Sequence, residues 1–514
     1  MNLDLSRLES DYGWQAYSLQ SMTEGNLLVA ELKMNQAVGT VCVDRKVGVS
    51  RRQFFAALST SMVLAGCSSP SRQINGQGIP TVAGLIARDK FLIAHRGSGD
   101  NWTEHTMAAY SSSLTAGATA IEVSVHATSD GILVCHHDES TLRMTGVDLD
   151  IGKHTFSELS GVLNDARAWL GPAAAPKPIP RLEAVLDAFA SRAVIFIEDK
   201  QGTNTELLLD LMDKYPRSRE RFVWKQPAAS LAYVGAKARG YTTWGYFMDD
   251  SDGAIEKYSR RFDLVGIFNG ASDDDIRKLV RVGIKTICWE IHTRSMAARV
   301  ESLGVDGLMC SNYPYVSTNL ALSGRDSFAT GRRAAGDLPS ALSWKFQPVI
   351  DPNEGSLAFN LPGPMGYSMG SLCPLPSEKA LIRFEVRWPG TLPSQGTAGI
   401  AFGLADDSPF IPGISGRAGY ILKIRPQGSM ELATRKEGVS HGTVIGTHQI
   451  TPMAPGEWRQ FSIGFNGVAV GCSSGDFELS KFTVDDVSNR GKYFSLVTSN
   501  EAGTSVEFRN IIVQ

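Results

Sequence analysis

The stretch of sequence that decides the fold is an apolar run that ends in a charged turn, Phe91-Leu92-Ile93-Ala94-His95-Arg96-Gly97. A short apolar run that stops at polar residues and glycine is typical of a buried β-strand that ends in a loop. The same arrangement recurs along the chain. Comparable runs lie at residues 91–94, 120–125, 132–135, 194–197, 222–224, 242–246, 264–268, 285–289 and 307–310.

Helical segments alternate with these runs. The i, i+3, i+4, i+7 spacing of one helix face is kept by Leu182, Val185, Leu186 and Phe189. Alternation of strands and helices predicts a parallel sheet. Residues 86–322 have the length of a (β/α)8 TIM barrel, which we expect as the fold of this region. The runs outnumber the eight strands of such a barrel by one, and the sequence leaves open which run is surplus.

The pattern changes after residue 322. Residues 323–340 are rich in Gly, Ala and Arg without periodicity, so we interpret them as a linker. Within residues 341–514, apolar positions alternate with charged ones, and residues 420–424 and 430–434 flank a turn at Pro426-Gln427-Gly428 as in a hairpin. The sequence therefore predicts an all-β sandwich for residues 341–514.

Composition excludes several classes of protein. The 514 residues hold 50 Lys and Arg against 53 Asp and Glu, a net charge of -3, so the chain has no basic excess with which to neutralise a nucleic acid. The 7 cysteines are too sparse and irregularly spaced for a disulfide scaffold or a cysteine-rich zinc site. We expect a globular protein that has no nucleic-acid partner.

Residues 50–67 carry a predicted export signal. The pair Arg51-Arg52 precedes an apolar stretch that is shorter than the about 20 residues needed to span a bilayer. This order is typical of a twin-arginine signal, and Leu64-Ala65-Gly66-Cys67 resembles a bacterial lipoprotein cleavage site with Cys67 as the lipidated residue. The alternative is a buried amphipathic helix that contains a chance arginine pair.

The segments around this signal complete the predicted N-terminal region. Because an export signal opens a chain, residues 1–49 are interpreted as a non-native extension or a leader, with an internal true start. Residues 68–85 begin with small polar residues and are interpreted as a tether. We therefore expect export by the twin-arginine route and a lipid anchor on Cys67 at the outer side of the bacterial cytoplasmic membrane.

Polar residues gather where successive predicted strands end. These residues are His95 and Arg96, then Glu122 and Ser124, then His137, and then Glu198 and Lys200. In a parallel barrel the carboxyl ends of all strands open on one face, where the working groups lie. A single His or Glu after a strand is more often a loop residue or a structural hydrogen-bonding group. Four successive strand ends of this kind predict an active site.

The order of these motifs resembles the glycerophosphodiester phosphodiesterase family, TIM barrels related to the phosphatidylinositol-specific phospholipases C. The motifs that carry the resemblance are Ala94-His95-Arg96-Gly97, Glu104-His105-Thr106, Ile121-Glu122, Thr128-Ser129-Asp130-Gly131, His137-Asp138, Glu198-Asp199-Lys200 and Gly304-Val305-Asp306-Gly307. The chain departs from the family pattern at two positions: His105 stands where the family has Asn, and Ser124 stands where it has a second metal-binding carboxylate.

The resemblance implies a role for each residue. A phosphodiester is anionic and repels nucleophiles, so its hydrolysis needs positive charge, a base for the attacking hydroxyl and an acid for the leaving alkoxide. The resemblance makes His95 and His137 the acid/base pair, because imidazole serves either role near neutral pH. It also implies that Arg96 and Lys200 bind the phosphate. The nucleophile is either a water or the substrate's own neighbouring hydroxyl.

The same resemblance implies a divalent cation, Ca²⁺ or Mg²⁺, held by Glu122 and Glu198. Because Ser124 is uncharged, three outcomes stay open: weak binding with water in the gap, which we favour, another ligand in place of Ser124, or no ion. Glu104 lies either near the metal or in the first turn of a helix, where the dipole favours a carboxylate. Trp289 either lines the rim of the pocket or packs in the core.

The predicted sandwich is similar to the concanavalin-like jelly rolls of secreted carbohydrate-active proteins. The segments Glu457-Trp458-Arg459-Gln460 and Val506-Glu507-Phe508-Arg509-Asn510-Ile511 carry this similarity. It implies a module that binds a glycan or packs against a partner.

We therefore expect an exported phosphoric diester hydrolase that splits glycerophosphodiesters into an alcohol and glycerol phosphate. Two alternatives remain. One is a phospholipase, similar to the sphingomyelinase D group, that uses the same histidines on intact lipid. The other is a surface glycan-binding protein whose barrel is inert.

Overall fold

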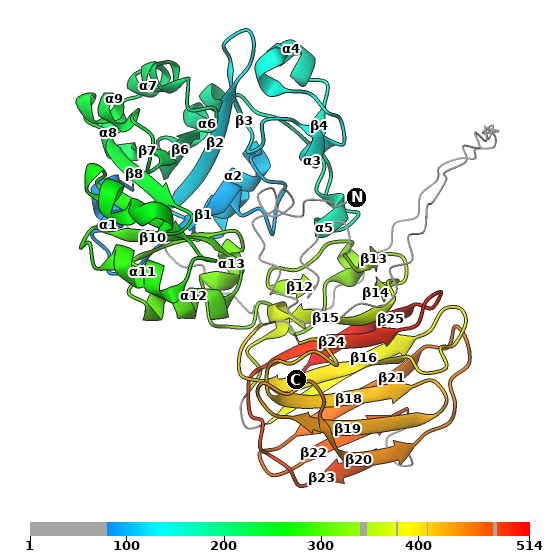
Figure 1. Cartoon of the computed structure of the whole chain (residues 1–514). Helices are drawn as coiled ribbons and strands as arrows, with labels where there is room; N and C mark the ends of the chain where they lie inside the picture. The colour runs from blue at the N-terminus through cyan, green and yellow to red at the C-terminus, as the bar shows by residue number, and fades with distance from the viewer. Residues whose placement is uncertain (1–79, 340–346, 377–378, 409, 476–480) are drawn as a thin grey trace, which may run out of the picture. The chain divides into compact units, whose positions relative to one another are not determined.

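The computed structural model describes residues 80–339, 347–376, 379–408, 410–475 and 481–514 (Figure 1). Residues 1–79, which hold the predicted extension, the twin-arginine signal, Cys67 and most of the tether, lie outside the described residues. The described chain contains an α/β region, coloured blue to green, and an all-β region, coloured yellow to red (Figure 1). In the part that is described, no helix has the length and apolar character to cross a bilayer.

The α/β region is a closed barrel of eight parallel strands, which confirms the predicted TIM barrel. Going round the barrel, the strands are β1 (Phe91–Ala94), β2 (Ala120–Ala127), β6 (Val194–Asp199), β7 (Phe222–Pro227), β8 (Thr242–Phe247), β9 (Leu264–Phe268), β10 (Thr286–Ile291) and β11 (Gly307–Cys310). The barrel closes because β1 pairs with both β2 and β11.

The surplus predicted run is β3 (Leu133–Cys135), which pairs antiparallel with the end of β2 and is no member of the parallel ring. The connection from β2 to β3 is a short turn in which the backbone N–H of Gly131 donates to the carbonyl of Thr128. A turn this short joins antiparallel strands only, because a parallel neighbour needs a long crossover.

Helices surround the barrel. They are α1 (Val82–Ile86), α2 (Met107–Thr115), α3 (Leu142–Thr145), α4 (Phe156–Leu159), α5 (Arg167–Leu170), α6 (Leu182–Phe189), α7 (Thr205–Asp213), α8 (Ser218–Arg221), α9 (Tyr233–Ala238), α10 (Ala254–Tyr258), α11 (Asp273–Val280), α12 (Arg294–Ser302) and α13 (Tyr313–Val316). Short 3₁₀ turns are η2 (His95–Gly97), η3 (Ile151–Lys153), η4 (Ser251–Gly253), η5 (Ser259–Arg261), η6 (Phe328–Thr330) and η8 (Gly370–Leu372). A two-stranded ribbon, β4 (Leu163–Asn164) with β5 (Lys177–Pro178), lies between α4 and α6 in the sequence.

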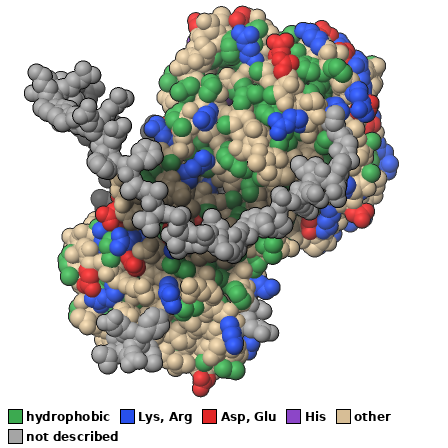
Figure 2. Space-filling model, turned by 180° about the vertical axis from the view of Figure 1, so that it is seen from behind, with side chains coloured by type: hydrophobic (Ala, Val, Ile, Leu, Met, Phe, Trp, Pro, Cys, Tyr) green, Lys and Arg blue, Asp and Glu red, His purple; other side chains and the backbone are tan. Residues whose placement is uncertain are grey.

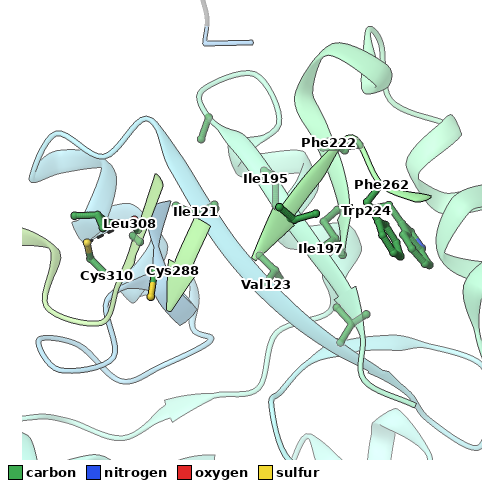
Figure 3. Close-up of a cluster of buried hydrophobic side chains, with 14 of the residues drawn as sticks. Ile121, Val123, Ile195, Ile197, Phe222, Trp224, Phe262, Cys288, Leu308 and Cys310 are labelled. Atoms are coloured by element: carbon green, nitrogen blue, oxygen red, sulfur yellow. Dashed lines mark hydrogen bonds between the residues drawn. The ribbon is translucent and has the colours of Figure 1, made fainter. Parts of the chain in front are cut away.

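Alternation along the strands divides the barrel core into two layers. The layer under the helices holds Ile121 and Val123 of β2 with Ile195 and Ile197 of β6, which point toward the same apolar cluster (Figure 3). Because side chains alternate along a strand, Glu122 and Ser124 of β2 and Glu198 of β6 point to the opposite face, into the barrel. The barrel floor beneath them is apolar and includes Phe196, Val223 and Trp244.

The C-terminal region consists of two seven-stranded antiparallel sheets, which confirms the predicted all-β fold. One sheet contains β12 (Asp337–Pro339), β15 (Gly363–Met369), β24 (Tyr493–Asn500), β17 (Thr397–Leu404), β18 (Gly419–Arg425), β19 (Ser429–Arg435) and β20 (Thr443–Gln449). The other contains β13 (Val349–Asp351), β14 (Ser356–Phe359), β25 (Val506–Val513), β16 (Ala380–Arg387), β21 (Arg459–Phe465), β22 (Val470–Ser474) and β23 (Lys481–Val484).

The predicted hairpin is β18–β19, in which Arg425 and Ser429 form the last pair before the turn. The predicted linker at 323–340 contains β12, an edge strand that pairs with β15 through its backbone. Its three residues are too few for a period-2 pattern to show in the sequence. Figure 2 shows one face of the described chain, on which acidic and basic side chains are interspersed with apolar ones.

Candidate active site

Strand register builds the deepest part of the site. Ser124 on β2 lies beside Glu198 on β6, and Glu198 lies beside Lys225 on β7. Neighbouring residues in register on parallel strands point to the same side of the sheet. These three side chains therefore form one layer at the carboxyl end of the barrel, with Glu122 two residues below Ser124 on the same face.

The turn after β1 places His95 and Arg96. Arg96 has a φ of 52° and Gly97 a φ of 75°, so the chain reverses sharply in the left-handed region. A Cβ atom on Gly97 would lie 2.8 Å from the Cβ of Ala109, so only glycine lets η2 pack this closely on α2. The turn is stabilised by a hydrogen bond in which the backbone N–H of Arg96 donates to Glu122 Oε2 at 3.0 Å.

The imidazole of His95 is buried, and its Nδ1 lies 2.9 Å from the hydroxyl oxygen of Ser311, just after β11. Burial lowers the pKa of His95 to about 4, and the neighbouring guanidinium of Arg96 adds to the effect. The ring is therefore neutral at neutral pH and able to accept a proton.

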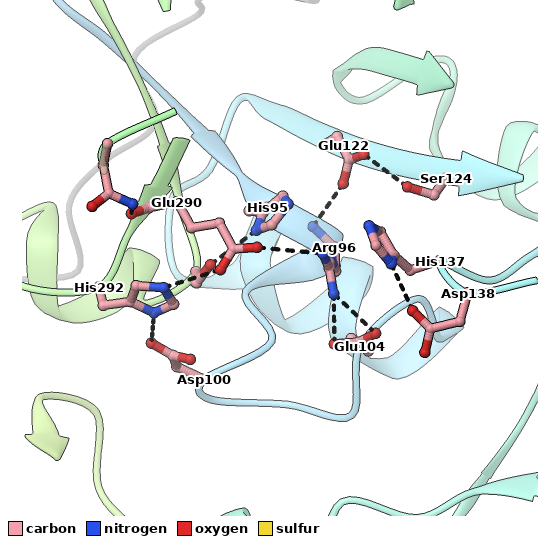
Figure 4. A network of polar contacts seen from close by, with 12 residues as sticks. His95, Arg96, Asp100, Glu104, Glu122, Ser124, His137, Asp138, Glu290 and His292 are labelled. Atoms are coloured by element: carbon pink, nitrogen blue, oxygen red, sulfur yellow. Dashed lines mark hydrogen bonds and ion pairs between the residues drawn. The ribbon is translucent and has the colours of Figure 1, made fainter. Parts of the chain in front are cut away.

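His137 follows β3 on the other side of Arg96 and is only half-buried (Figure 4). Its Nδ1 lies 2.7 Å from Asp138 Oδ1, and Arg143 Nε donates to Asp138 Oδ2 at 2.5 Å. Burial, together with the positive charges of Arg96 and Lys200, holds the pKa of His137 well below its usual value. The carboxylate on Nδ1 orients the ring and leaves Nε2 as its reactive nitrogen.

Two carboxylates hold the guanidinium of Arg96 (Figure 4). Its Nη1 lies 3.4 Å from both oxygens of Glu104, and its Nη2 lies 3.3 Å from Glu290 Oε1. Glu104 also accepts from Arg143 Nη2 at 2.5 Å. Glu104 precedes α2, whose N-cap is Thr106, so it is not in the first turn of that helix. Because Glu104 contacts the guanidinium of Arg96 through both of its oxygens, we interpret it as a carboxylate that orients Arg96.

A buried histidine lies behind Glu290. His292 Nδ1 is 2.7 Å from Asp100 Oδ2, and its Nε2 is 3.2 Å from Glu290 Oε2. Burial opposes a charge on His292, but the carboxylates of Asp100 and Glu290 outweigh it and raise its pKa to about 9. His292 is therefore protonated at neutral pH and fixes the carboxylate that faces Arg96.

Lys225 lies between the two predicted metal ligands. Its Nζ donates to Glu122 Oε1 at 2.9 Å and forms an ion pair with Glu198 Oε2 at 2.6 Å. Burial opposes the charge on Lys225, but the two carboxylates outweigh it and raise its pKa. Glu122 Oε1 also accepts from Ser124 Oγ at 3.1 Å.

Glu198 has two further partners. Its Oε1 accepts from Lys200 Nζ at 3.2 Å and from the hydroxyl of Tyr246 at 2.6 Å. The layer thus contains two carboxylates and two ammonium groups. Its ionic groups are paired with one another.

A divalent cation at Glu122 and Glu198 does not fit this arrangement. The ion would need the carboxylate oxygens that Lys225 already occupies, and Ser124 offers only a neutral hydroxyl that donates to Glu122. Among the described residues, no group of three or more His, Cys, Asp or Glu side chains is arranged to hold a metal ion. The divalent cation implied by the resemblance therefore stays a prediction that the geometry of this layer does not support.

Trp289 packs among aromatic rings inside the barrel. Its ring meets Tyr246 edge-on with centroids 5.1 Å apart, and Trp244 edge-on at 6.1 Å. Of the two interpretations left open by the sequence, the contacts favour packing, at the same end of the barrel as Glu290.

The polar residues at the predicted strand ends lie together in the structure: His95, Arg96, Glu122, Ser124, His137, Glu198 and Lys200. Searching strand ends for polar residues nevertheless missed several residues of the site. Lys225 follows the apolar run 222–224 just as Glu198 follows 194–197, so the same search applied to that strand would have found it. Arg143 and His292 lie in segments without a motif, and only the folded chain places them at the site.

A TIM barrel with two histidines and a half-buried arginine at neighbouring strand ends has the fold and the site residues of the class of phosphoric diester hydrolases. Residues 95–313 match the family described as "Glycerophosphoryl diester phosphodiesterase family". This match spans the barrel strands from the end of β1 to β11.

Two curated proteins and one solved structure are among those similar to this chain. YhdW of Bacillus subtilis (strain 168) is 26% identical over 243 residues, which make up 44% of this chain and 95% of that protein. A glycerophosphodiester phosphodiesterase of the same organism is 30% identical over 148 residues, and the match spans 46% of its length. A solved structure of an Oleispira antarctica phosphodiesterase with its product sn-glycerol-3-phosphate is 19% identical, with a TM-score of 0.39, covering 44% of this chain and 94% of that one.

Proposed function

We propose that the barrel hydrolyses glycerophosphodiesters to an alcohol and glycerol phosphate, with His95 and His137 as the acid/base pair. The observation that carries the proposal is the placement of two histidines on either side of a guanidinium held by two carboxylates, in a barrel that matches this family. Histidines flanking a phosphate-binding arginine can serve both ends of a scissile P–O bond.

In this proposal Arg96 and Lys200 bind the diester. The planar guanidinium of Arg96 offers parallel N–H donors to two phosphoryl oxygens. Its carboxylate partners fix its plane before substrate arrives, so little side-chain freedom is lost on binding. Lys200 adds a point charge above Glu198, and it is the more exposed member of that pair.

His95 is the base in this scheme. Its neutral ring takes the proton of the attacking hydroxyl, which belongs to a water or to the neighbouring hydroxyl of the glycerol group. As the new P–O bond forms and the old one breaks, His137 protonates the departing alkoxide. The anionic diester beside His137 and the carboxylate of Asp138 both favour the imidazolium that this step requires. If the nucleophile is the substrate's hydroxyl, a water then opens the cyclic phosphate with the two roles exchanged.

The test is hydrolysis of a panel of water-soluble glycerophosphodiesters by the full chain, with release of glycerol phosphate as the readout. His137→Ala should abolish most of the activity. His154→Ala is the matched control, because the ring Nδ1 of His154 lies 2.8 Å from the carbonyl oxygen of Asp150, outside the site. Absence of glycerol phosphate from every substrate, or equal activity in His137→Ala, would refute the proposal.

A second candidate is hydrolysis of a phospholipid by the same histidines. A human relative named lysophospholipase D GDPD1 is 29% identical over 146 residues, and the match spans 46% of its length. Comparing soluble diesters with phospholipid vesicles, with analysis of both products, separates the two candidates. Turnover of vesicles alone would favour the phospholipase. Hydrolysis of either substrate that disappears in His137→Ala would refute an inert barrel with only a glycan-binding role.

The proposal extends to the location of the protein. We infer export by the twin-arginine route and a lipid anchor on Cys67, which would place the barrel beside the lipids whose head groups it acts on. The arginine pair and the lipoprotein-like site at Cys67 support this inference. A glycan partner for the sandwich is a further proposal that rests on the similarity of residues 341–514 to jelly rolls, and binding to a glycan array tests it.

A further inference from the structure

We propose that the ammonium group of Lys225 replaces the divalent cation in this barrel, so that diester hydrolysis here needs no metal ion. The role in hydrolysis rests on the proposed function, whereas the replacement itself rests on the contacts of Lys225 alone.

The position of Nζ carries the first step of the argument. An ion that bridged Glu122 and Glu198 would lie about 2.0–2.6 Å from an oxygen of each carboxylate. Lys225 Nζ lies 2.9 Å from Glu122 Oε1 and 2.6 Å from Glu198 Oε2. The ammonium group therefore fills the point between the carboxylates that a bridging ion would take.

Charge carries the second step. Two carboxylates without cations would attract a divalent ion strongly, but here Lys225 and Lys200 already balance them. At position 124 the family has a carboxylate, which would give the layer an excess of negative charge, and this chain has the uncharged Ser124 there. Because Ser124 lies beside Glu198 in the strand register, an Asp at this position would add a negative charge next to the ion pair. Ser124 removes a negative charge from the layer and Lys225 adds a positive one. Both residues therefore lower the affinity of the layer for a divalent cation.

The surroundings of Lys225 show that it is held in place. Its side chain is 8% exposed, and Nζ lies 5.4 Å from the ring centroids of both Trp244 and Tyr246. Aromatic faces favour an ammonium group at this distance. Tyr246 also donates to Glu198, so one side chain contacts both members of the ion pair.

The arrangement leaves Lys225 able to act on substrate. An ammonium group has three donors, and among the described residues Lys225 Nζ donates to Glu122 and forms an ion pair with Glu198. Lys225 therefore supplies a fixed positive charge below the reacting phosphate, where a metal ion would otherwise stabilise the developing charge.

The first experiment measures metal binding without reference to activity. Calorimetric titration of the purified full chain with Mg²⁺, Ca²⁺ and Mn²⁺ should show no saturable binding at millimolar ion, and the unfolding temperature should not change. Saturable binding of any of the three ions, abolished by Glu122→Gln, would overturn the proposal.

Variants test whether Lys225 is the cause. Lys225→Ala/Ser124→Asp should bind a divalent ion, with a rise in unfolding temperature that the wild type lacks, whereas Ser124→Asp alone should not. Lys237→Ala is the matched control, because it removes a lysine that pairs with Asp263 away from the site. Saturable binding by Ser124→Asp, or no binding by a folded double variant, would overturn the proposal. The wild-type titration decides the question even where a variant fails to fold.

Activity supplies the last arm. Hydrolysis by the wild type should change less than about twofold in excess chelator, and a loss of more than about tenfold that added metal restores would overturn the inference. Absence of hydrolysis in all conditions, with no metal binding by calorimetry, would refute the proposed function and leave the replacement by Lys225 standing.

Discussion

The buried histidine behind the site allows a quantitative prediction about stability. His292→Gln keeps the volume of the side chain and one hydrogen bond but removes the charge that lies between Asp100 and Glu290. The variant should be less stable than the wild type at neutral pH, because it leaves two buried carboxylates without their shared cation.

The size of the effect follows from the pKa of His292. Folding raises this pKa from its usual 6.5 to about 9. At 1.36 kcal/mol per unit, the shift corresponds to about 3 kcal/mol of stability. Because the folded-state pKa is the higher one, this stabilisation is fully present below the unfolded-state pKa of 6.5. It is lost as the pH rises through 9.

The assay is the free energy of unfolding of the barrel, read from hydrogen exchange in β1 and β10 across a urea series. The difference between the wild type and His292→Gln should shrink by about 3 kcal/mol between about pH 6 and about pH 9.5. His154→Gln, which alters a histidine outside the site, should show no such trend. A difference between wild type and His292→Gln that is constant over this range would refute the reasoning.

Three further predictions concern catalysis and anchoring. His95→Ala and His137→Ala should each lower turnover by about 10²–10⁴, and the double variant should be little worse than the worse single one; additive losses in steady-state assays would contradict a shared step. Arg96→Lys should raise KM about tenfold, since a lysine cannot bridge Glu104 and Glu290 while it binds phosphate, and an unchanged KM would argue against the clamp. Cys67→Ala should move the protein from the membrane to the soluble fraction, as lipoproteins are held by more than one acyl chain; unchanged fractionation would exclude this anchor.

The sequence predicted the fold well because barrel strands are short apolar runs that end in polar residues. The runs at 264–268 and 307–310 are β9 and β11 to the residue. The surplus run at 132–135 could not be identified, because hydrophobicity marks burial and not the direction in which a strand pairs. Strand β12 was missed because its three residues are too few for an alternating pattern to show in the sequence.

The candidate site was predictable in its motifs and unpredictable in its charge balance. The three outcomes left open for Ser124 are weak binding with water, another ligand and no ion, and none of them places a lysine between Glu122 and Glu198. Lys225 lies 101 residues after Ser124, and only the strand register through Glu198 brings the two into one layer. A family motif records the positions of the metal ligands, so a comparison with it shows which ligands are present and which are lost. A residue that replaces the ion itself is not part of the motif, and the comparison cannot find it.

The depth of each charge explains how a site with so many carboxylates can bind an anion. In the pairs that Lys200 and Arg96 form with carboxylates at the mouth, the cation is the more exposed partner: Lys200 is 21% exposed against 2% for Glu198, and Arg96 is 15% exposed against 9% for Glu104. The carboxylates lie beneath, where they hold the cations in place, and those around Arg96 raise its pKa. An approaching phosphodiester therefore meets the positive ends of these pairs first, and the negative ends act on it from a greater distance. Lys225, at 8% exposed against 0% for Glu122, continues this order to the floor of the barrel. A divalent ion is one way to present positive charge above buried carboxylates, and a buried lysine is another.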